Sequence, residues 1–561
     1  MKKSGERRSG IKIMSGLIVM LGSLAYIMLF AVINGSLGYL SAMGVTVFGA
    51  VGVAKALGAS VGMSYGAIAA LAVLCGVLRG ILRYLEQYCN HYIAFKLLAT
   101  LRSKIFAALR RLCPAKLETE KKGSIIAMIT SDVETLEVFY AHTLSPVCIA
   151  LTVCLAVIIF VGVISSVYLA LTALCGYVVI GVILPLISSR LLKKSGVEYR
   201  RTFSLFNAYF MDSIKGVKDI LYHNAGEERK AQVDRRSDEL LVHTRSMKKN
   251  IVNAGAITEF AVTVFILITL AVGIILCNKN ILGIGEAVIA VVTVFGSFGP
   301  VIAISALPGN LTQTLASGDR VLNLMEEKPA ITPIEDGKNP EFNELTVKDM
   351  SFGYEENRKV LEEIDLSARS GEIVGIVGES GCGKSTLLKL LLRFWSKDSG
   401  RIEYGGEDIE EVNTESLLEN VTMVSQSAYL FDDTVEENLR IAKRDATYEE
   451  IVQACKKASI HDFIASREEG YNFKVGPSGE NLSAGEKQRI GLARAFLRGS
   501  KILLLDEPTS NVDSINEGII LKSLVDRRKD MCIILVSHRE STMSIADRVY
   551  RIQKGKICEV R

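Results

Sequence analysis

The sequence predicts an all-α transmembrane domain of six helices, followed by an α/β P-loop ATPase domain. Three observations carry this prediction. Residues 1–310 contain long apolar runs, and a helix needs about 20 such residues to cross a bilayer. Residues 340–561 have the composition of a soluble domain and include Gly378-Glu-Ser-Gly-Cys-Gly-Lys-Ser385, which fits the pattern of a phosphate-binding loop. A chain of 561 residues is also too long for one core, so at least two domains are expected.

The apolar runs predict six spans. Their expected positions lie near residues 13–34, 66–87, 143–163, 166–188, 252–276 and 284–306. No charged residue occurs from Ile13 to Ala54, a stretch long enough for one span and an outer segment, or for two spans. Basic residues among the first twelve place the N-terminus in the cytoplasm. The ATPase domain must lie there too, because ATP does. The number of spans is therefore even, and residues 35–65 are interpreted as mostly an outer segment.

The segments between the spans support this topology. Eight basic residues lie in the inner segment between Cys89 and Tyr140, whereas the outer turn at residues 162–165 is uncharged. Apolar residues three and four apart in residues 100–112 indicate helices that extend into the cytoplasm, where they would transmit motion to the membrane. A cleaved signal peptide is the alternative for the first span, but its apolar run is too long. We expect a multi-pass protein of a bacterial cytoplasmic membrane, with both termini in the cytoplasm.

Three prolines in residues 326–344 mark a linker, together with Asp336-Gly337. The eleven cysteines form no C-x-x-C pair, and the six histidines show no metal-ligand spacing. The sequence therefore predicts reduced thiols and no zinc site. The expected domains are a transmembrane domain at 1–325, the linker at 326–344 and the ATPase domain at 345–561.

The phosphate-binding loop is expected to hold ATP and Mg²⁺. A strand over residues 373–377 and a helix over residues 385–393 provide the context that the pattern requires. The ammonium group of Lys384 would reach the β- and γ-phosphates, and the hydroxyl group of Ser385 would bind Mg²⁺. The other expected nucleotide contacts in the loop are Gly378, Glu379, Ser380, Gly381, Cys382, Gly383 and Thr386.

A second apolar strand, residues 501–505, ends in two carboxylates. Asp506 suits the Mg²⁺ coordination shell. Glu507 suits the orientation or deprotonation of the attacking water. The structural alternative is a strand that simply ends in two solvated acids.

With these motifs the sequence resembles the ABC transporter family. Residues 482–489, Leu-Ser-Ala-Gly-Glu-Lys-Gln-Arg, are similar to the signature motif of that family, and residues 510–513 to its D-loop. Gln426 matches the Q-loop, and His538 matches the switch histidine. Tyr354 lies where the family stacks an aromatic ring on adenine.

The resemblance implies a dimer that closes on ATP. Each of two ATP molecules would sit between the phosphate-binding loop of one chain and the signature of the other. Ser483, Gly485 and Glu486 would therefore meet the nucleotide of the partner. His538 would contact the γ-phosphate held by its own chain, and Gln426 would sense that phosphate and Mg²⁺. Closure on ATP and opening after hydrolysis would drive alternating access. A membrane domain ahead of the ATPase domain resembles an exporter half-transporter, which requires a second half.

Two residues depart from the family pattern. Ala484 replaces the usual first glycine of the signature, and its methyl group beside a phosphate would slow turnover unless alanine is tolerated. Pro477 stands where related exporters often have a glutamate, so the coupling of the ATP site to the inner loops would differ. Cys382 occupies a variable loop position, where a small residue fits and a redox switch is the alternative.

The membrane half carries a second resemblance. Residues 83–102 and 131–146 are similar to the CydC-type subunit of cytochrome bd-assembly exporters, with a weaker similarity at 207–230. The resemblance implies a heterodimer with an unlike subunit, export of small thiols such as cysteine or glutathione, and a link to haem.

Five residues of the membrane half are candidate contacts of cargo or haem. Arg79, Arg83 and Glu86 are spaced four and three residues apart and share one helix face. Charges in a membrane favour a watery cavity or another helix, because a charge at the bilayer centre costs about 2.5–3.5 kcal/mol. The three would bind an anion such as a carboxylate or a haem propionate. Alternatively, Arg83 and Glu86 pair at the inner membrane edge. His91 is a possible haem ligand or an inter-helix histidine, and Glu259 is a further cavity candidate.

Other functions fit the same residues. An exporter of drugs, lipids or peptides has the same architecture. An ATP-gated channel or membrane regulator, and an importer of iron carriers on an exporter-like scaffold, are further alternatives.

Overall fold

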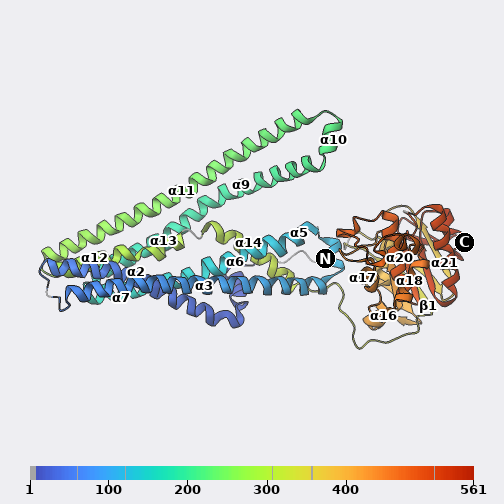
Figure 1. The fold of residues 1–561 in the computed structure, drawn as a ribbon, viewed down its shortest axis with the longest axis horizontal. Coiled ribbons are helices and arrows are strands. Elements are labelled where there is room, and N and C mark those ends of the chain that lie inside the picture. The colour runs from blue at the N-terminus through green and yellow to red at the C-terminus, as the bar shows by residue number, and fades with distance from the viewer. Residues whose placement is uncertain (1–7, 60, 121, 306–307, 356–357, 511) are drawn as a thin grey trace. The chain divides into compact units, whose positions relative to one another are not determined.

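The structure is a computed structural model that describes residues 8–59, 61–120, 122–305, 308–355, 358–510 and 512–561. It divides into two compact units, which are drawn as ribbons in Figure 1. The described residues of the membrane unit are 8–110 and 120–327, and those of the ATPase unit are 111–119 and 328–561. The segment 111–119 therefore belongs to the ATPase unit, although membrane helices precede and follow it in the sequence.

The membrane unit confirms the predicted number of spans. Among the described residues, six helices are long and apolar enough to cross a membrane: Gly22–Ala56, Tyr65–Leu112, Gly123–Ile164, Val167–Arg190, Gly226–Asn278 and Ile284–Ser305.

Several of these spans contain short turns of 3₁₀- or π-helix, so each is built from one or more helical elements. The elements are α1 (Gly10–Val19), η1 (Gly22–Leu24), α2 (Ala25–Ala56), α3 (Tyr65–Leu112), α5 (Lys122–Ala127), η2 (Met128–Asp132), α6 (Val133–Phe139), η3 (Tyr140–Leu144), α7 (Ser145–Ile164), α8 (Val167–Val178), η4 (Val179–Ile183), α9 (Leu184–Lys215), α10 (Val217–Tyr222), α11 (Gly226–Asn278), α12 (Ile284–Ser297), α13 (Gly299–Ser305) and α14 (Pro308–Glu326).

The predicted bounds of the first span, 13–34, are wrong. Residues 10–19 form the separate helix α1, which at about 1.5 Å per residue is too short to cross a bilayer. The chain turns at Gly22, whose φ of +48° favours a residue without a Cβ. Helix α2 then continues to Ala56. Residues 35–56 are therefore helical, and the one charged residue among them, Lys55, lies in the last turn of the helix.

Two spans continue far beyond the thickness of a bilayer, as the periodicity of residues 100–112 predicted. Helix α3 has 48 residues and α11 has 53, which at about 1.5 Å per residue gives lengths of roughly 70 and 80 Å. A hydrocarbon core is only about 30 Å thick. Helices α9 and α11 pack side by side and are joined by α10, and together they form the long hairpin visible in Figure 1.

The ATPase unit contains two sheets. The four-stranded sheet has the order β2-β1-β4-β5, and the six-stranded sheet has the order β10-β9-β3-β8-β7-β6. Strands β9, β3, β8, β7 and β6 run parallel to their neighbours, and β10 pairs antiparallel with β9. The strands are β1 (Glu344–Phe352), β2 (Leu361–Arg369), β3 (Ile373–Gly378), β4 (Ser399–Tyr404), β5 (Glu407–Asp408), β6 (Val421–Val424), β7 (Ile502–Asp506), β8 (Cys532–Val536), β9 (Arg548–Gln553) and β10 (Lys556–Glu559).

Helices pack in two hydrophobic cores, one of which also includes strands of both sheets. They are α15 (Lys384–Leu391), α16 (Thr414–Asn420), α17 (Val435–Arg440), α18 (Tyr448–Lys457), α19 (His461–Ala465), α20 (Ala484–Arg498), α21 (Ser514–Arg527) and α22 (Glu540–Met543), and α4 (Ala115–Thr119) joins them from the segment 111–119.

The sequence of the parallel strands explains why the ATP motifs meet. Strands β7 and β8 are buried along their whole length, and such continuous apolar runs are typical of strands covered on both faces. Because β3, β7 and β8 are parallel neighbours, the segments that follow them emerge at the same edge of the sheet. These segments carry the phosphate-binding loop, the Asp506-Glu507 pair and His538.

Candidate functional site

The phosphate-binding loop connects β3 to α15, as the sequence predicted. Gly381 and Gly383 have φ angles of +82° and +108°, a region that favours glycine. A Cβ at Gly383 would also lie 2.8 Å from the side chain of Leu361. The Nζ atom of Lys384 donates hydrogen bonds to the carbonyl oxygens of Gly378 and Glu379, each at 2.8 Å. The loop is thus curled around its own lysine, at the N-terminus of a helix, where anions are favoured.

Glu507 lies at the centre of a set of polar contacts. Its carboxylate accepts a hydrogen bond from Nε2 of Gln426 at 2.9 Å, and its other oxygen lies 2.9 Å from Nε2 of His538. The backbone of Glu507 has a φ of +51°, and its carbonyl oxygen accepts from Nε2 of Gln488 at 2.6 Å. Three predicted site residues from three separate segments therefore converge on one point.

These groups line a cavity of about 440 Å³, which is within the range of roughly 300–1,000 Å³ found for pockets of small ligands. The predicted residues that line it are Tyr354, Ser380, Gly381, Gly383, Lys384, Ser385, Thr386, Gln426, Asp506, Glu507 and His538. The cavity also contains Glu355, Arg358 and Val360, which the sequence analysis missed. They belong to no motif, and they lie between β1 and β2, a segment that meets the phosphate-binding loop only in the folded chain.

Tyr354 lies at one side of the cavity, where adenine stacking was predicted. Its ring packs edge-on against Phe352 and Trp395, with centroid distances of 5.0 and 5.1 Å. Its hydroxyl group lies 3.1 Å from Oγ1 of Thr386. The ring is therefore held in place by neighbours on one side, while the residue lines the cavity.

Trp395 connects Tyr354 to the segment 111–119. Its Nε1 donates a hydrogen bond to the carboxylate of Glu118 in α4 at 3.0 Å. The same carboxylate lies 2.9 Å from Nζ of Lys389 in α15. A residue of the first inner segment is thus bound both to the helix that follows the phosphate-binding loop and to the aromatic group beside the nucleotide cavity.

The signature residues lie elsewhere on the ATPase unit. Ser483 is the N-cap of α20, and its side chain accepts from the backbone N–H of Glu486, whose carboxylate accepts in turn from the N–H of Ser483 at 2.8 Å. Such a reciprocal cap fixes the start of a helix. Ser483 and Ala484 are exposed, and neither they nor Gly485 line the cavity of this chain. Their role towards a partner's nucleotide stays a prediction.

Part of the predicted D-loop, Asn511, lies outside the described residues. The turn at Pro477, upstream of the signature, is described. Gly476 before it and Ser478 after it have φ angles of +75° and +54°, and the Ser478 carbonyl accepts from Nζ of Lys487 at 3.0 Å. The proline is thus part of a tight turn tied to α20.

In the membrane unit, Arg83 and Glu86 form an ion pair. The Glu86 side chain is only 2% exposed, and one of its oxygens lies 2.5 Å from Nη1 of Arg83. The guanidinium group, by contrast, is half-exposed and lies over the ring of Tyr39 at 5.5 Å. A Cβ at Gly35 would lie 2.3 Å from the side chain of Ile149 in α7 and 3.1 Å from the Glu86 carboxyl carbon, so the absence of a side chain there leaves room for both.

The pair lines a second cavity, of about 250 Å³. The residues around it are Tyr39, Arg83, Glu86, Gln87, Ala141, His142, Pro146, Ile149, Pro300 and Ala303. Arg79, His91 and Glu259 are not among them, although the ring of His91 packs edge-on against that of His142 at 6.0 Å. Arg79 and Glu259 are exposed on the single protomer. The sequence analysis missed His142, which carries no spacing signal and reaches the cavity from the turn η3.

Comparisons with known proteins agree with both units. The family model described as "ABC transporter transmembrane region" matches residues 24–301, and the model described as "ABC transporter" matches residues 361–510. A "Probable ABC transporter ATP-binding/permease protein" of Haemophilus influenzae is 44% identical, over 98% of this chain and 100% of its own length.

Two further similarities concern function and fold. A "Putative multidrug export ATP-binding/permease protein YgaD" of Bacillus subtilis is 31% identical, over 85% of this chain and 82% of its own length. The solved structure of a bacterial Atm1-family ABC exporter with ATP bound covers 96% of this chain and 95% of its own, with a TM-score of 0.80 and 23% identity. At that identity the likeness concerns the fold alone.

Proposed function

The chain belongs to the ABC transporter family as an exporter half-transporter with its ATPase domain on the same polypeptide, and from this premise we propose that it exports a small carboxylate-bearing solute. ATP hydrolysis coupled to transport is the activity of this family. The observation that carries the ATP-driven part of the proposal is the convergence of Gln426 and His538 on Glu507 in the nucleotide cavity, in a chain with six helices long and apolar enough to span a membrane. The choice of cargo rests on the half-exposed Arg83 beside a second cavity.

The residues of the cavity suit Mg²⁺-ATP. Asp506, Ser385 and Gln426 all line it and offer the oxygen ligands that Mg²⁺ prefers. When bound, the ion neutralises charge that develops on the phosphates. Lys384 would exchange its two carbonyl contacts for phosphate oxygens, and Glu507 would orient and deprotonate the attacking water.

A second half-transporter subunit would complete the transporter. ABC half-transporters work as dimers, and the exposed position of Ser483 and Ala484 leaves the signature free to meet a partner's nucleotide. The hairpin of α9 and α11 also exposes many large apolar side chains in the single protomer. Among them are Phe203, Leu205, Phe210, Leu241, Val242, Ile251 and Val252. We propose an unlike partner, as the CydC-type resemblance implies.

The cavity beside Arg83 is the proposed cargo site. An ionisable residue within a membrane domain marks a functional site by default. Glu86 is buried and already paired, whereas Arg83 is half-exposed, and a guanidinium has five N–H donors suited to carboxylates. Gln87 and His142 add polar groups to the same wall. The chemistry favours a small acid, such as the thiol-containing cysteine or glutathione.

Haem does not fit this site as the protomer forms it. Histidine is a common haem ligand; His91 does not line the cavity, although His142 does. The cavity volume of about 250 Å³, however, is below the roughly 300–1,000 Å³ of pockets for drug-sized ligands, so a haem group does not fit inside it.

A second candidate function is multidrug export. The relative from Bacillus subtilis, 31% identical, is named as a putative multidrug exporter. The two candidate functions differ in the transported solute, and both use the same ATP-driven transporter. A hydrophobic cationic dye would stimulate ATP hydrolysis under this alternative, whereas cysteine or glutathione would do so under the leading proposal.

Glu507→Gln tests the hydrolytic part of the proposal. Removing a general base costs about 10²–10⁴ in rate, so we expect ATP hydrolysis by the purified full-length dimer to fall by at least about 100-fold. The binding of ATP should persist, because Lys384 and the loop are unchanged. Hydrolysis at the unaltered rate would refute the role of Glu507.

Arg83→Gln tests the cargo part. We expect this variant to lose the stimulation of ATP hydrolysis by cysteine or glutathione. The matched control is Lys55→Gln, which removes a charge in the last turn of α2 that contacts Met63 and Tyr65; it should retain the stimulation. Equal stimulation in both variants would contradict the proposed site, and stimulation of the unaltered protein by the dye alone would favour multidrug export.

A further inference from the structure

A buried carboxylate lies beside the ATP site without lining it. Glu517 in α21 is only 6% exposed. One oxygen accepts hydrogen bonds from the hydroxyl groups of Thr509, Ser541 and Thr542 at 3.2, 3.1 and 2.7 Å. The other oxygen accepts from Nη1 of Arg539 at 3.0 Å. A buried charge is costly unless it is paired and hydrogen-bonded in this way. Four donor side chains therefore hold the Glu517 carboxylate in one position.

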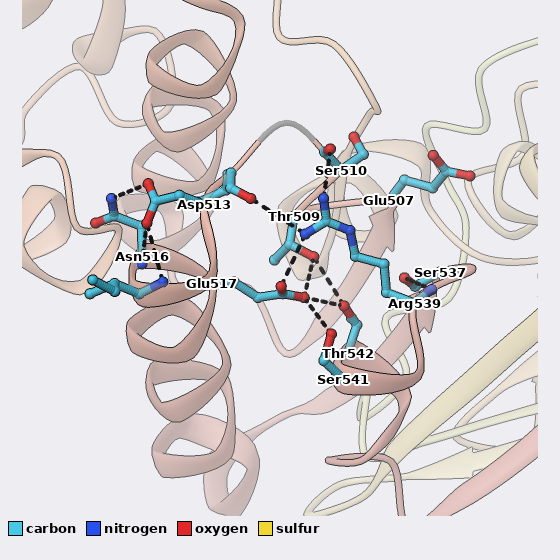
Figure 2. A network of polar contacts seen from close by, with 12 residues as sticks. Glu507, Thr509, Ser510, Asp513, Asn516, Glu517, Ser537, Arg539, Ser541 and Thr542 are labelled. Atoms are coloured by element: carbon cyan, nitrogen blue, oxygen red, sulfur yellow. Dashed lines mark hydrogen bonds and ion pairs between the residues drawn. The ribbon is translucent and has the colours of Figure 1, made fainter.

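Arg539 extends the network to the loop that follows Glu507. Its Nη2 donates to the carbonyl oxygen of Ser510 at 3.1 Å, and its Nη1 lies 3.4 Å from that of Val512. Figure 2 shows the guanidinium group reaching between this loop and Glu517. A single side chain thus binds the backbone on both sides of Asn511, which lies outside the described residues, and the carboxylate of α21.

Two residues of this network are close in the sequence to the proposed catalytic residues. Arg539 directly follows His538, and Thr509 is the second residue after Glu507. Strands β7 and β8 are in register up to the pair Asp506–Val536, so Glu507 and His538 both lie just past the end of the sheet. The backbone N–H of Glu507 still donates to the carbonyl oxygen of Val536 at 2.9 Å, so the contact of Glu507 with His538 at 2.9 Å depends on the path of the two loops beyond that hydrogen bond.

We propose that Arg539 and Glu517 are positioning residues for ATP hydrolysis, which hold the loop after Glu507 against the loop that carries His538. Neither side chain lines the nucleotide cavity, so they act through Glu507 and His538. The planar fork of arginine suits this role because it donates to a carboxylate and to two carbonyl groups at once, whereas the ammonium of lysine is a single point charge. The inference rests on the proposed roles of Glu507 and His538.

The test is the steady-state kinetics of ATP hydrolysis by the full-length chain in its native dimer. Arg539→Lys keeps the charge and removes the fork. We expect kcat to fall about 10- to 100-fold, since a misplacement of about 1 Å costs on that order. KM for ATP should stay within about twofold, because the phosphate-binding loop is untouched. Glu517→Gln should lower kcat to a similar extent. The kcat of the double variant should be no lower than that of the more impaired single variant, because the two residues act as a unit.

The matched control is Arg528→Lys. Arg528 pairs with Asp547 at 2.9 Å, and its side chain is 40% exposed, as is that of Arg539. The control should keep kcat. A kcat for Arg539→Lys that stays within about twofold of the unaltered value, or a loss in which KM rises in parallel, would overturn the inference. If Glu517→Gln does not fold, the half-exposed Arg539→Lys decides alone. Full activity of Glu507→Gln would instead refute the proposed function, whatever the two positioning variants do.

Discussion

At the scale of single residues, the nucleotide cavity is lined mostly by side chains that belong to short sequence motifs. Lys384, Gln426, Glu507 and His538 belong to motifs whose spacing reflects fixed chemistry, and the structure gathers all four in one cavity. Arg358 and His142 line the two cavities but were not predicted. No local pattern marks them, because their place depends on strands or helices that meet only in the folded chain.

Ala484 is one residue whose effect is measurable by itself. It is the first residue of α20 and is exposed, so the backbone accepts a methyl group there without a clash inside this chain. If that methyl group lies beside the partner's phosphate, Ala484→Gly should raise kcat for ATP by about threefold, equivalent to roughly 0.6 kcal/mol. An unchanged or lower kcat in steady-state assays would show that alanine is tolerated.

Glu517 also predicts a dependence of stability on pH. Burial raises the pKa of its carboxyl group, but hydrogen bonds from Thr542, Ser541 and Thr509 and the charge of Arg539 outweigh burial and leave the pKa below its ordinary value. A carboxyl with a lowered folded-state pKa stabilises the fold above its unfolded pKa of about 4.3, and this stability is lost as the pH falls further.

The prediction is that Tm of the ATPase unit falls more steeply below about pH 4.3 in the unaltered chain than in Glu517→Gln. Thermal unfolding of the full-length chain in detergent, scanned from neutral to acid pH, measures this difference. Parallel pH profiles of the two proteins would contradict the assignment.

At the scale of elements, the sequence predicted the type and number of the spans but misplaced the first. Because residues 13 to 54 are uncharged, no charge marks where the first span begins or ends. Hydropathy alone does not show that the chain turns at Gly22. The extension of α3 was predicted because the apolar periodicity of residues 100–112 continues past the membrane. The placement of residues 111–119 with the ATPase unit was not predicted, because it depends on contacts with residues that lie more than 250 positions later.

Because α4 contacts Trp395, tryptophan fluorescence reports on the surroundings of α4. Trp395 is the chain's one tryptophan, its ring lies 5.1 Å from that of Tyr354, and its Nε1 donates to Glu118. Binding of ATP beside Tyr354 should therefore change the tryptophan fluorescence of the full-length chain. Glu118→Gln should shift the emission in the absence of nucleotide, because a neutral amide replaces the charged acceptor.

The control for this experiment is Lys384→Ala, in which ATP should no longer change the emission. An ATP-induced change of the same size in that variant would show that the signal does not report the nucleotide cavity. In a dimer with an unlike partner, Trp395→Phe identifies any signal that comes from tryptophans of the other half.

At the scale of the whole molecule, the two units form one machine only if ATP hydrolysis in one moves a solute through the other. Family models of ABC transporters match both units, and the described residues contain six candidate membrane spans. The chain therefore has both an ATPase domain and a membrane domain. The long helices provide a physical connection, since α3 leads directly into the segment 111–119, which packs in the ATPase unit. The second half-transporter is needed to complete this assembly, because ABC half-transporters work as dimers.

The most direct test uses everted membrane vesicles that contain the native dimer, incubated with a small-molecule extract of the cytoplasm. Mass spectrometry then compares the vesicle contents with Mg²⁺-ATP and with ADP, for the unaltered chain and for Lys384→Ala. If ATP drives export, at least one small acidic solute accumulates inside the vesicles with Mg²⁺-ATP, and only when Lys384 is present. Identical contents in both proteins would contradict ATP-driven export, as would ATP-dependent loss of a solute from preloaded vesicles.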